Sequence, residues 1–298
     1  MSPLPEVFTL GHSPDPDDAF MFYAMAEEKI DLRGYRFEHR LEDIQTLNER
    51  ATRGELHISA ISIHAYSFVA DKYALLPCGA SMGDGYGPMV VEMEKGEHRT
   101  PNIELRTSKG DDAARAWLQG KRIAVPGKLT SAYLALQLFL GGEFEHIVVP
   151  FDQIFEAVKS GRADCGLIIH EGQLTYASAG FRKIVDLGEW WKRDTSLPLP
   201  LGGNVLRKDI PPAVRRDLSQ ILRESIEYGL THRAEGVQHS MPYARDMDAS
   251  LASEFIGMYV NDYTRDYGAT GREAIRRFLG AAADAGLIRP PAALEFVD

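Results

Sequence analysis

Cysteine is scarce in this 298-residue chain, which contains only two, Cys78 and Cys165. They lie far apart in the sequence, and neither belongs to a C-x-x-C pair or to a cysteine–histidine spacing typical of metal sites. We therefore expect two buried free thiols and no bound metal. Thiols of this kind suit a reducing compartment.

Long hydrophobic runs are also missing, and none would cross a bilayer. The opening residues, MSPLPEVFTLGHSPDPDDAF, have neither a basic start nor an apolar stretch of signal-peptide length. We therefore expect a cytoplasmic protein that does not associate with membranes.

Positive charge is in short supply, because 33 Lys and Arg residues face 43 Asp and Glu residues, for a net charge of −10. This balance argues against a nucleic-acid surface, which normally presents clustered Lys and Arg. It leaves room for an anionic small molecule, since a pocket on an acidic protein can be locally positive.

Common catalytic signatures are absent as well. The glycine-rich stretch GDGYGP matches neither the dinucleotide-binding pattern nor the P-loop, and G-x-S-x-G and H-E-x-x-H do not occur. The sequence therefore predicts neither a nucleotide cofactor nor a zinc-protease site.

What the chain does contain is a regular alternation of short apolar runs with amphipathic stretches, which is typical of an α/β protein. Strands are expected at 7–13, 35–43, 56–62, 121–127, 146–151 and 164–171. Helices are expected at 18–30, 44–55, 63–73, 113–120, 131–142, 153–161, 211–233, 250–264 and 271–287.

Two segments are expected to connect domains. Residues 96–112 are the most loop-like part of the chain, and residues 197–209 are interpreted as a return crossing. We therefore expect a larger, discontinuous domain of residues 1–95 plus 203–298, interrupted by a smaller one of residues 96–202. Each would hold a mixed, mainly parallel sheet flanked by helices, with a ligand cleft between the two lobes.

A histidine and a glutamate end one of the apolar runs, in CGLIIHEGQLTY at 165–176. The continuous run is typical of a central strand buried on both faces. His170 would emerge at its carboxyl end, where histidine is suited to proton transfer near neutral pH; a merely solvated histidine is the alternative. Because strand side chains alternate, we expect Glu171 to point away from His170 and to have a supporting role.

Two strand-to-helix switches carry small polar residues. In PGKLTSAY, Thr130 or Ser131 can cap the next helix, whose free N–H groups can hold a carboxylate; an ordinary N-cap exposed to water is the alternative. Ser62 occupies the same position in SAISIHAY, where helix capping is the simpler expectation, and we expect His64 to be packed. The acidic stretch SPDPDDAF favours a turn and a helix start over a metal site.

Taken together, several segments resemble one enzyme family. GHSPDPDDAFMFYA, LEDIQTLNERA, PGKLTSAY, LIIHEGQLTY, VVDLGEWWKRDTSLPLPLGGNVLRKD and YVNDY are similar to the 1,4-dihydroxy-6-naphthoate synthases of the futalosine route to menaquinone. The resemblance extends nearly end to end. It implies the two-lobed fold of type II periplasmic binding proteins.

The resemblance also implies an activity: conversion of cyclic dehypoxanthinylfutalosine, a small carboxylate, with no cofactor or metal. It assigns His170 as the general base, and Asn48, Ser62, Thr130 and Ser131 as substrate-binding residues. The chain would act as a monomer or homodimer.

One departure from the family pattern lies in the first loop, where Asp17 stands in place of an asparagine and Ala19 in place of a threonine. An inward-pointing Asp17 would oppose a substrate carboxylate. Two other functions remain open: a transporter's solute-binding protein, and the sister enzyme chorismate dehydratase, which we expect to lack the LIIHE segment.

Overall fold

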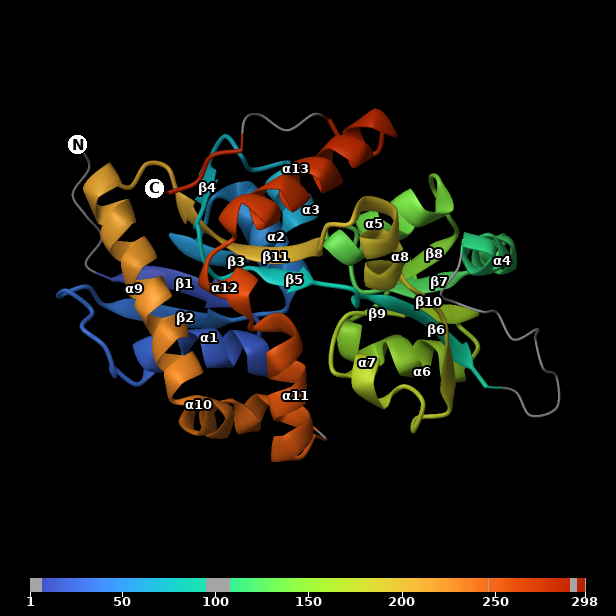
Figure 1. Cartoon of the computed structure of the whole chain (residues 1–298), viewed down its shortest axis with the longest axis horizontal. Coiled ribbons are helices and arrows are strands. Elements are labelled where there is room, and N and C mark those ends of the chain that lie inside the picture. Colours follow the sequence, from blue (N-terminus) through green and yellow to red (C-terminus); the bar gives the residue numbers. More distant parts are fainter. Residues whose placement is uncertain (1–6, 95–107, 246, 290–293, 298) are drawn as a thin grey trace. The chain divides into compact units, whose positions relative to one another are not determined.

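The computed structural model describes residues 7–94, 108–245, 247–289 and 294–297 (Figure 1). The chain forms two compact units. The first unit comprises residues 1–82, 200–279 and 290–298, and the second comprises residues 83–199 and 280–289.

This division differs from the expected ranges at residues 83–95, 200–202 and 280–289. Strand β6 (Met89–Met93) pairs with β9 (Cys165–Ile168) and β10 (Phe181–Asp186), so it is part of the second sheet. The chain therefore leaves the first unit before β6 and not after it. Of the expected loop at 96–112, residues 96–107 lie outside the described part, and a helix, α4 (Ser108–Leu118), is already present from Ser108.

The first unit is built on one mixed sheet with the strand order β2-β1-β3-β11-β4, and β5 pairs with β11. β1 is parallel to β2 and β3, whereas β11 is antiparallel to β3 and β4. The strands are β1 (Phe8–His12), β2 (Phe37–Leu41), β3 (Ile58–Ser62), β4 (Tyr73–Leu75), β5 (Ser81–Gly83) and β11 (Leu199–Arg207).

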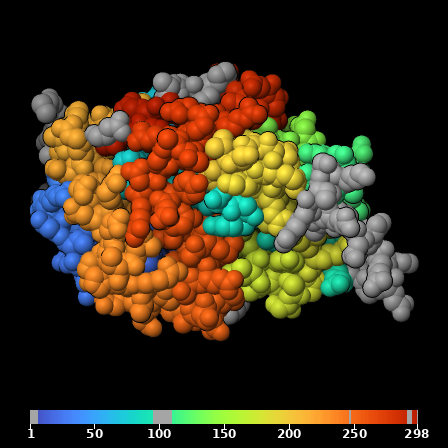
Figure 2. All heavy atoms as spheres, viewed as in Figure 1, coloured from blue at the N-terminus to red at the C-terminus, as the bar shows by residue number. Residues whose placement is uncertain are grey.

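Helix α1 packs against α9, α10 and α11, and its apolar side chains share a core cluster with β1 and α9. The space-filling view shows the C-terminal helices, in orange and red, covering this face of the first unit (Figure 2). The helices are α1 (Pro16–Ala26), α2 (Ile44–Arg53), α3 (Ile63–Tyr66), α9 (Pro212–Thr231), α10 (Arg233–Ser240), the 3-10 helix η2 (Met241–Tyr243), α11 (Ala249–Tyr259), α12 (Asp262–Arg265) and α13 (Gly268–Asp284).

Local sequence signals explain how α2 begins and ends. The Asp43 carboxylate accepts hydrogen bonds from the backbone N–H groups of Gln45 and Thr46, at 3.0 and 3.1 Å. Gly54 ends the helix with φ 71°, in the left-handed region that glycine adopts without steric cost. The helix expected at residues 44–55 is therefore confirmed as α2, and it ends at Gly54.

The second unit holds a five-stranded mixed sheet with the order β10-β6-β9-β7-β8. Its remaining strands are β7 (Ile123–Val125) and β8 (His146–Val148). β9 occupies the central position, antiparallel to β6 and parallel to β7, and all four of its residues are buried. The expected central strand at the start of CGLII is thus confirmed.

Helix α6 packs against β6, β7 and β9, where its side chains form the core of this unit. Gly166 allows the close approach, because a Cβ there would lie 2.3 Å from the Ile154 Cγ2 atom. Besides α4, the helices are α5 (Ser131–Leu140), the 3-10 helix η1 (Phe151–Gln153), α6 (Ile154–Lys159), α7 (Gly172–Thr175) and α8 (Leu187–Thr195).

Some expectations about the elements were wrong. Each sheet has two parallel and two antiparallel pairings of defined register, so neither is mainly parallel. The antiparallel pairings of defined register all involve β6, which follows the crossing at 82–83, or β11, which spans the crossing at 199–200. The helix expected at 63–73 is only the four-residue α3 followed by turns, and β4, β10, α8 and α10 were not foreseen.

Both cysteines are buried free thiols, as expected, Cys78 in the first unit and Cys165 in the second. Burial raises the pKa of the Cys78 thiol to about 12 and also raises that of Cys165. Thiols with such pKa values remain protonated at neutral pH and are poor nucleophiles.

Candidate active site

In the first unit, Asn48 and Ser62 form a closed pair of hydrogen bonds. The Asn48 Nδ2 donates to the Ser62 Oγ at 3.0 Å, and the Ser62 backbone N–H donates to the Asn48 Oδ1 at 2.8 Å. Asn48 comes from α2 and is fully buried, and Ser62 is the last residue of β3. The sequence placed these residues in one site, and the structure brings them into direct contact.

Ser62 does not cap α3 with its side chain, although it occupies the N-cap position. Its hydroxyl accepts the Asn48 bond, and the described part of the chain offers no acceptor for its own proton. The hydroxyl can therefore donate a hydrogen bond to a ligand. The expectation of a routine serine cap is wrong, because the β3–α3 connection turns this side chain toward α2.

In the second unit, Thr130 caps α5. Its Oγ1 accepts from the Tyr133 backbone N–H at 3.2 Å and donates to the Gly127 carbonyl at 2.8 Å. Both Thr130 and Ser131 are buried. The Thr130 side chain is thus a helix N-cap, as the alternative interpretation expected. An anion at this turn would be bound by the backbone N–H groups and the dipole at the start of α5.

His170 lies just beyond β9, is only 8% exposed, and is packed between the rings of Phe151 and Phe155. Its Nε2 is 3.0 Å from the Phe151 carbonyl, and its Nδ1 accepts from the Gly172 backbone N–H at 3.0 Å. The structure therefore places this histidine in a buried pocket of backbone groups and not on a solvated strand end.

These contacts fix the neutral form of the ring. Because the Gly172 N–H is a donor, Nδ1 must carry the lone pair, and the proton must lie on Nε2, where it points at the Phe151 carbonyl. Nδ1 is thus the only basic nitrogen of the ring. To accept a proton from a substrate, it must first lose the hydrogen bond from the Gly172 N–H.

Glu171 contacts His170, contrary to expectation. Its Oε2 is 3.5 Å from the His170 Nδ1, and its side chain is 12% exposed. The strand ends at Ile168, so both residues belong to a turn and the alternation of strand side chains does not apply. A carboxylate at this distance stabilises the imidazolium that protonation of Nδ1 would create.

The acidic loop after β1 carries less negative charge than its sequence indicates. Burial, together with the neighbouring carboxylates of Asp18 and Asp15, raises the pKa of Asp17 well above its usual value. Burial also raises the pKa of Asp18 to about 7. The raised pKa of Asp17 therefore weakens the repulsion that an inward-pointing carboxylate would exert on a substrate carboxylate.

Sequence reasoning missed a histidine pair beside this loop. The Nε2 of His12 lies 3.1 Å from the Nδ1 of His39, and burial followed by the charge of His39 lowers the pKa of His12 to about 3. His12 ends β1 within the GHS triplet, a position at the carboxyl end of a strand that could have drawn attention to it.

The DLG stretch in the second unit has a structural explanation. Asp186 caps α8 by accepting from the Gly188 and Glu189 N–H groups, at 2.9 and 3.0 Å. A Cβ on Gly188 would lie 1.9 Å from the Tyr86 carbonyl oxygen, so only glycine fits against the GDGYGP turn. These segments shape the unit and supply no reacting group.

Among the described residues, no group of three or more His, Cys, Asp or Glu side chains is arranged to hold a metal ion. In the same ranges, no helix is both long enough and apolar enough to cross a bilayer.

Comparisons with a family model and with named relatives agree on one family. The chain matches the family described as Menaquinone biosynthesis over residues 8–284. A relative from Thermus thermophilus named 1,4-dihydroxy-6-naphthoate synthase is 35% identical over 285 residues, which cover 96% of this chain and 97% of the relative. A relative of the same name from Streptomyces coelicolor is 35% identical over 299 residues, covering 98% and 99%.

Solved structures give the fold. A crystal structure of a protein from Archaeoglobus fulgidus has a TM-score of 0.85 and 41% identity, and covers 95% of this chain and 99% of its own. The alkanesulfonate-binding protein of Xanthomonas axonopodis pv. citri bound to MOPS has a TM-score of 0.68 at 13% identity, covering 96% of each chain. The expected periplasmic-binding-protein-like fold is confirmed, and the chain belongs to the Menaquinone biosynthesis family.

Proposed function

We propose that this chain is a lyase that converts cyclic dehypoxanthinylfutalosine to 1,4-dihydroxy-6-naphthoate, with loss of the sugar-derived part of the substrate. One observation carries the proposal: two relatives named 1,4-dihydroxy-6-naphthoate synthase match 96% and 98% of the chain at 35% identity. Matches of this length include the segments that hold all five candidate site residues.

Within this proposal His170 is the general base. The Nδ1 lone pair takes the substrate proton in place of the Gly172 N–H bond, while the Nε2–H continues to donate to the Phe151 carbonyl. The Glu171 carboxylate, 3.5 Å away, stabilises the resulting imidazolium. Hydrogen bonds at an empty site often rearrange when substrate binds. Formation of the aromatic naphthalene ring supplies the driving force.

In our proposal, Thr130 and Ser131 bind the substrate carboxylate at the N-terminus of α5, where the helix dipole favours a negative charge. Asn48 and Ser62 bind a polar group of the substrate. Their mutual hydrogen bonds hold the Ser62 hydroxyl in one orientation, which lowers the conformational entropy lost when a ligand accepts its proton.

We also propose a cytoplasmic protein, since its two cysteines are free thiols, acting as a monomer or homodimer. The fold is compatible with a solute-binding function. The alkanesulfonate-binding protein that shares this fold, however, is only 13% identical to this chain. The 35% identical relatives favour the enzyme.

A paired assay tests the reaction. Purified protein is incubated separately with cyclic dehypoxanthinylfutalosine and with chorismate, and substrate loss and product formation are followed by chromatography and mass spectrometry. We expect only the futalosine derivative to be consumed. Loss of chorismate would identify a dehydratase, and a bound ligand recovered unchanged would identify a binding protein.

A second experiment tests the base. The substitution His170→Asn removes the basic nitrogen, so we expect kcat to fall by about 100-fold to 10,000-fold, a range typical of general acid–base catalysis. Substrate binding, measured by calorimetry, should persist. His146→Asn is the matched control, because His146 is a half-buried histidine of the same unit. Its ring, like that of His170, contacts a backbone carbonyl: the His146 Nδ1 is 2.9 Å from the Phe144 oxygen. Substantial turnover by His170→Asn would contradict the assignment.

A further inference from the structure

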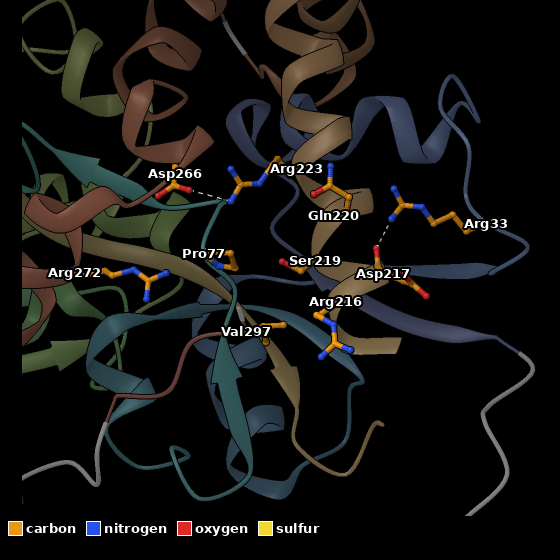
Figure 3. Close-up of a pocket in the computed structure, with 10 residues that line it drawn as sticks. All are labelled: Arg33, Pro77, Arg216, Asp217, Ser219, Gln220, Arg223, Asp266, Arg272 and Val297. Carbon is orange, nitrogen blue, oxygen red and sulfur yellow. Dashed lines mark hydrogen bonds and ion pairs between the residues drawn. The ribbon is translucent and has the colours of Figure 1, made fainter. Parts of the chain in front are cut away.

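The first unit has a pocket lined by arginines, with a volume of about 620 Å³ (Figure 3). Its walls come from the loop after α1, from α9 and from the start of α13, and it includes none of the five candidate site residues. Small-molecule pockets typically measure about 300 to 1,000 Å³, so a metabolite-sized ligand fits.

Charge is the distinguishing property of this pocket. Four guanidinium groups line it, from Arg33, Arg216, Arg223 and Arg272, against the carboxylates of Asp217 and Asp266 and that of Glu224, which pairs with Arg33, so the formal charge is +1. The whole chain has a net charge of −10. Positive charge gathered this way on an acidic protein attracts small anions and repels cations.

Two of the arginines already have carboxylate partners. Arg223 pairs with Asp266 at 2.9 Å, and Arg33 pairs with Glu224 at 2.7 Å, where both side chains are about one-third exposed. Arg272 lies over the ring of Phe296, with 4.0 Å between the guanidinium carbon and the ring centroid. These contacts orient the three guanidinium groups without removing their charge.

Arg216 is different, because the described ranges hold no hydrogen-bond or ion-pair partner for its side chain. The Ser219 hydroxyl, one turn further along α9, also has no hydrogen-bond partner there, although the residue is only 7% exposed. The pocket therefore offers a charged donor and a hydroxyl donor on the same helix, both unused by the fold.

We propose that this pocket binds a small molecule carrying a phosphate group. Figure 3 shows the guanidinium groups of Arg216, Arg223 and Arg272 on different sides of Ser219. A tetrahedral phosphate presents oxygens in several directions and can accept from guanidinium groups that lie on different sides, whereas one planar carboxylate matches a single guanidinium fork. The Ser219 hydroxyl supplies a further donor.

Inorganic pyrophosphate is a suitable probe, tested by isothermal titration calorimetry at constant ionic strength, with inorganic phosphate and citrate as comparisons. We expect saturable binding of pyrophosphate at one site per chain, weaker binding of phosphate, and a lower affinity as salt is raised. Citrate binding as tightly as pyrophosphate, or no heat from any phosphate, would overturn the proposal.

Variants localise the site. Arg216→Gln should weaken pyrophosphate binding about tenfold or more, because it removes a charge-assisted hydrogen bond, while the thermal midpoint of the free protein stays unchanged. Arg276→Gln is the matched control on α13, since Arg276 lies one turn beyond Arg272 and pairs with Glu273 at 3.2 Å. Equal binding by the wild type and Arg216→Gln, or an equal loss in Arg276→Gln, would contradict the assignment. The result does not depend on the proposed enzymatic reaction.

Discussion

Asp18 gives a quantitative test of how burial controls charge in the first unit. Its carboxylate is 8% exposed, and its Oδ2 accepts from the Ser13 backbone N–H at 2.6 Å. Burial raises the pKa of Asp18 from 3.8 to about 7, partly offset by the Ser13 bond. The substitution Asp18→Asn keeps the size and the hydrogen-bond acceptor but removes the charge.

The direction in which stability changes with pH follows from which state of the protein binds the proton. Between pH 4 and pH 7 the folded protein holds a proton on Asp18 that the unfolded chain has lost, so stability falls as pH rises through this window. A difference of about 3 pKa units corresponds to about 4 kcal/mol at pH 8. Because Asp17 and Asp18 titrate together, we expect about 2 to 4 kcal/mol for the single substitution.

Urea unfolding at pH 8 and at pH 4.5 measures this difference. Asp18→Asn should be more stable than the wild type by about 2 to 4 kcal/mol at pH 8 and nearly equal at pH 4.5. Asp262→Asn is the control, because the Asp262 side chain is 98% exposed, and it should show no such pH dependence. A variant that is less stable at pH 8, or a difference that is the same at both pH values, would refute the reasoning.

Two further substitutions test packing and the buried polar pair. Gly188→Ala should destabilise the second unit by about 1 to 3 kcal/mol, because its Cβ would lie 1.9 Å from the Tyr86 oxygen; Gly280→Ala in α13 has open space and should instead be neutral or stabilising in thermal unfolding. Asn48→Ala should cost about 1 to 3 kcal/mol in urea unfolding, because it leaves the buried Ser62 N–H without its acceptor. Unchanged stability in Gly188→Ala or Asn48→Ala would count against the described contacts.

Much of the fold could be predicted from local patterns. The apolar run beginning at Cys165 gave the central strand β9, and the glycines at 54 and 141 marked the ends of α2 and α5, where φ is 71° and 81°. These signals are local, because a strand buried on both faces has no polar positions and a left-handed helix end favours glycine. The segment 181–195 was missed because its edge strand is half polar and does not alternate, although the apolar residues at 187, 190 and 191 do have the spacing of a helix.

The candidate site was less accessible to sequence reasoning. The resemblance assigned the residues of the site, including Asn48 and Ser62 as substrate-binding residues, but the hydrogen bonds between these two were not predicted. The partners of His170 could not, because the Phe151 carbonyl that fixes its tautomer is 19 residues away and is brought close only by the η1–α6 turn. The Glu171 contact was missed because the strand ends at Ile168, one residue before the end of its apolar run and before His170 and Glu171.

The two buried thiols have a practical consequence. Cys78 belongs to one unit and Cys165 to the other, and both have side chains sealed from solvent with raised pKa values. An alkylating reagent can therefore reach each sulfur only when the surrounding unit opens. Peptide mapping of the labelled chain would report the opening of each half separately, using natural residues as the two reporters.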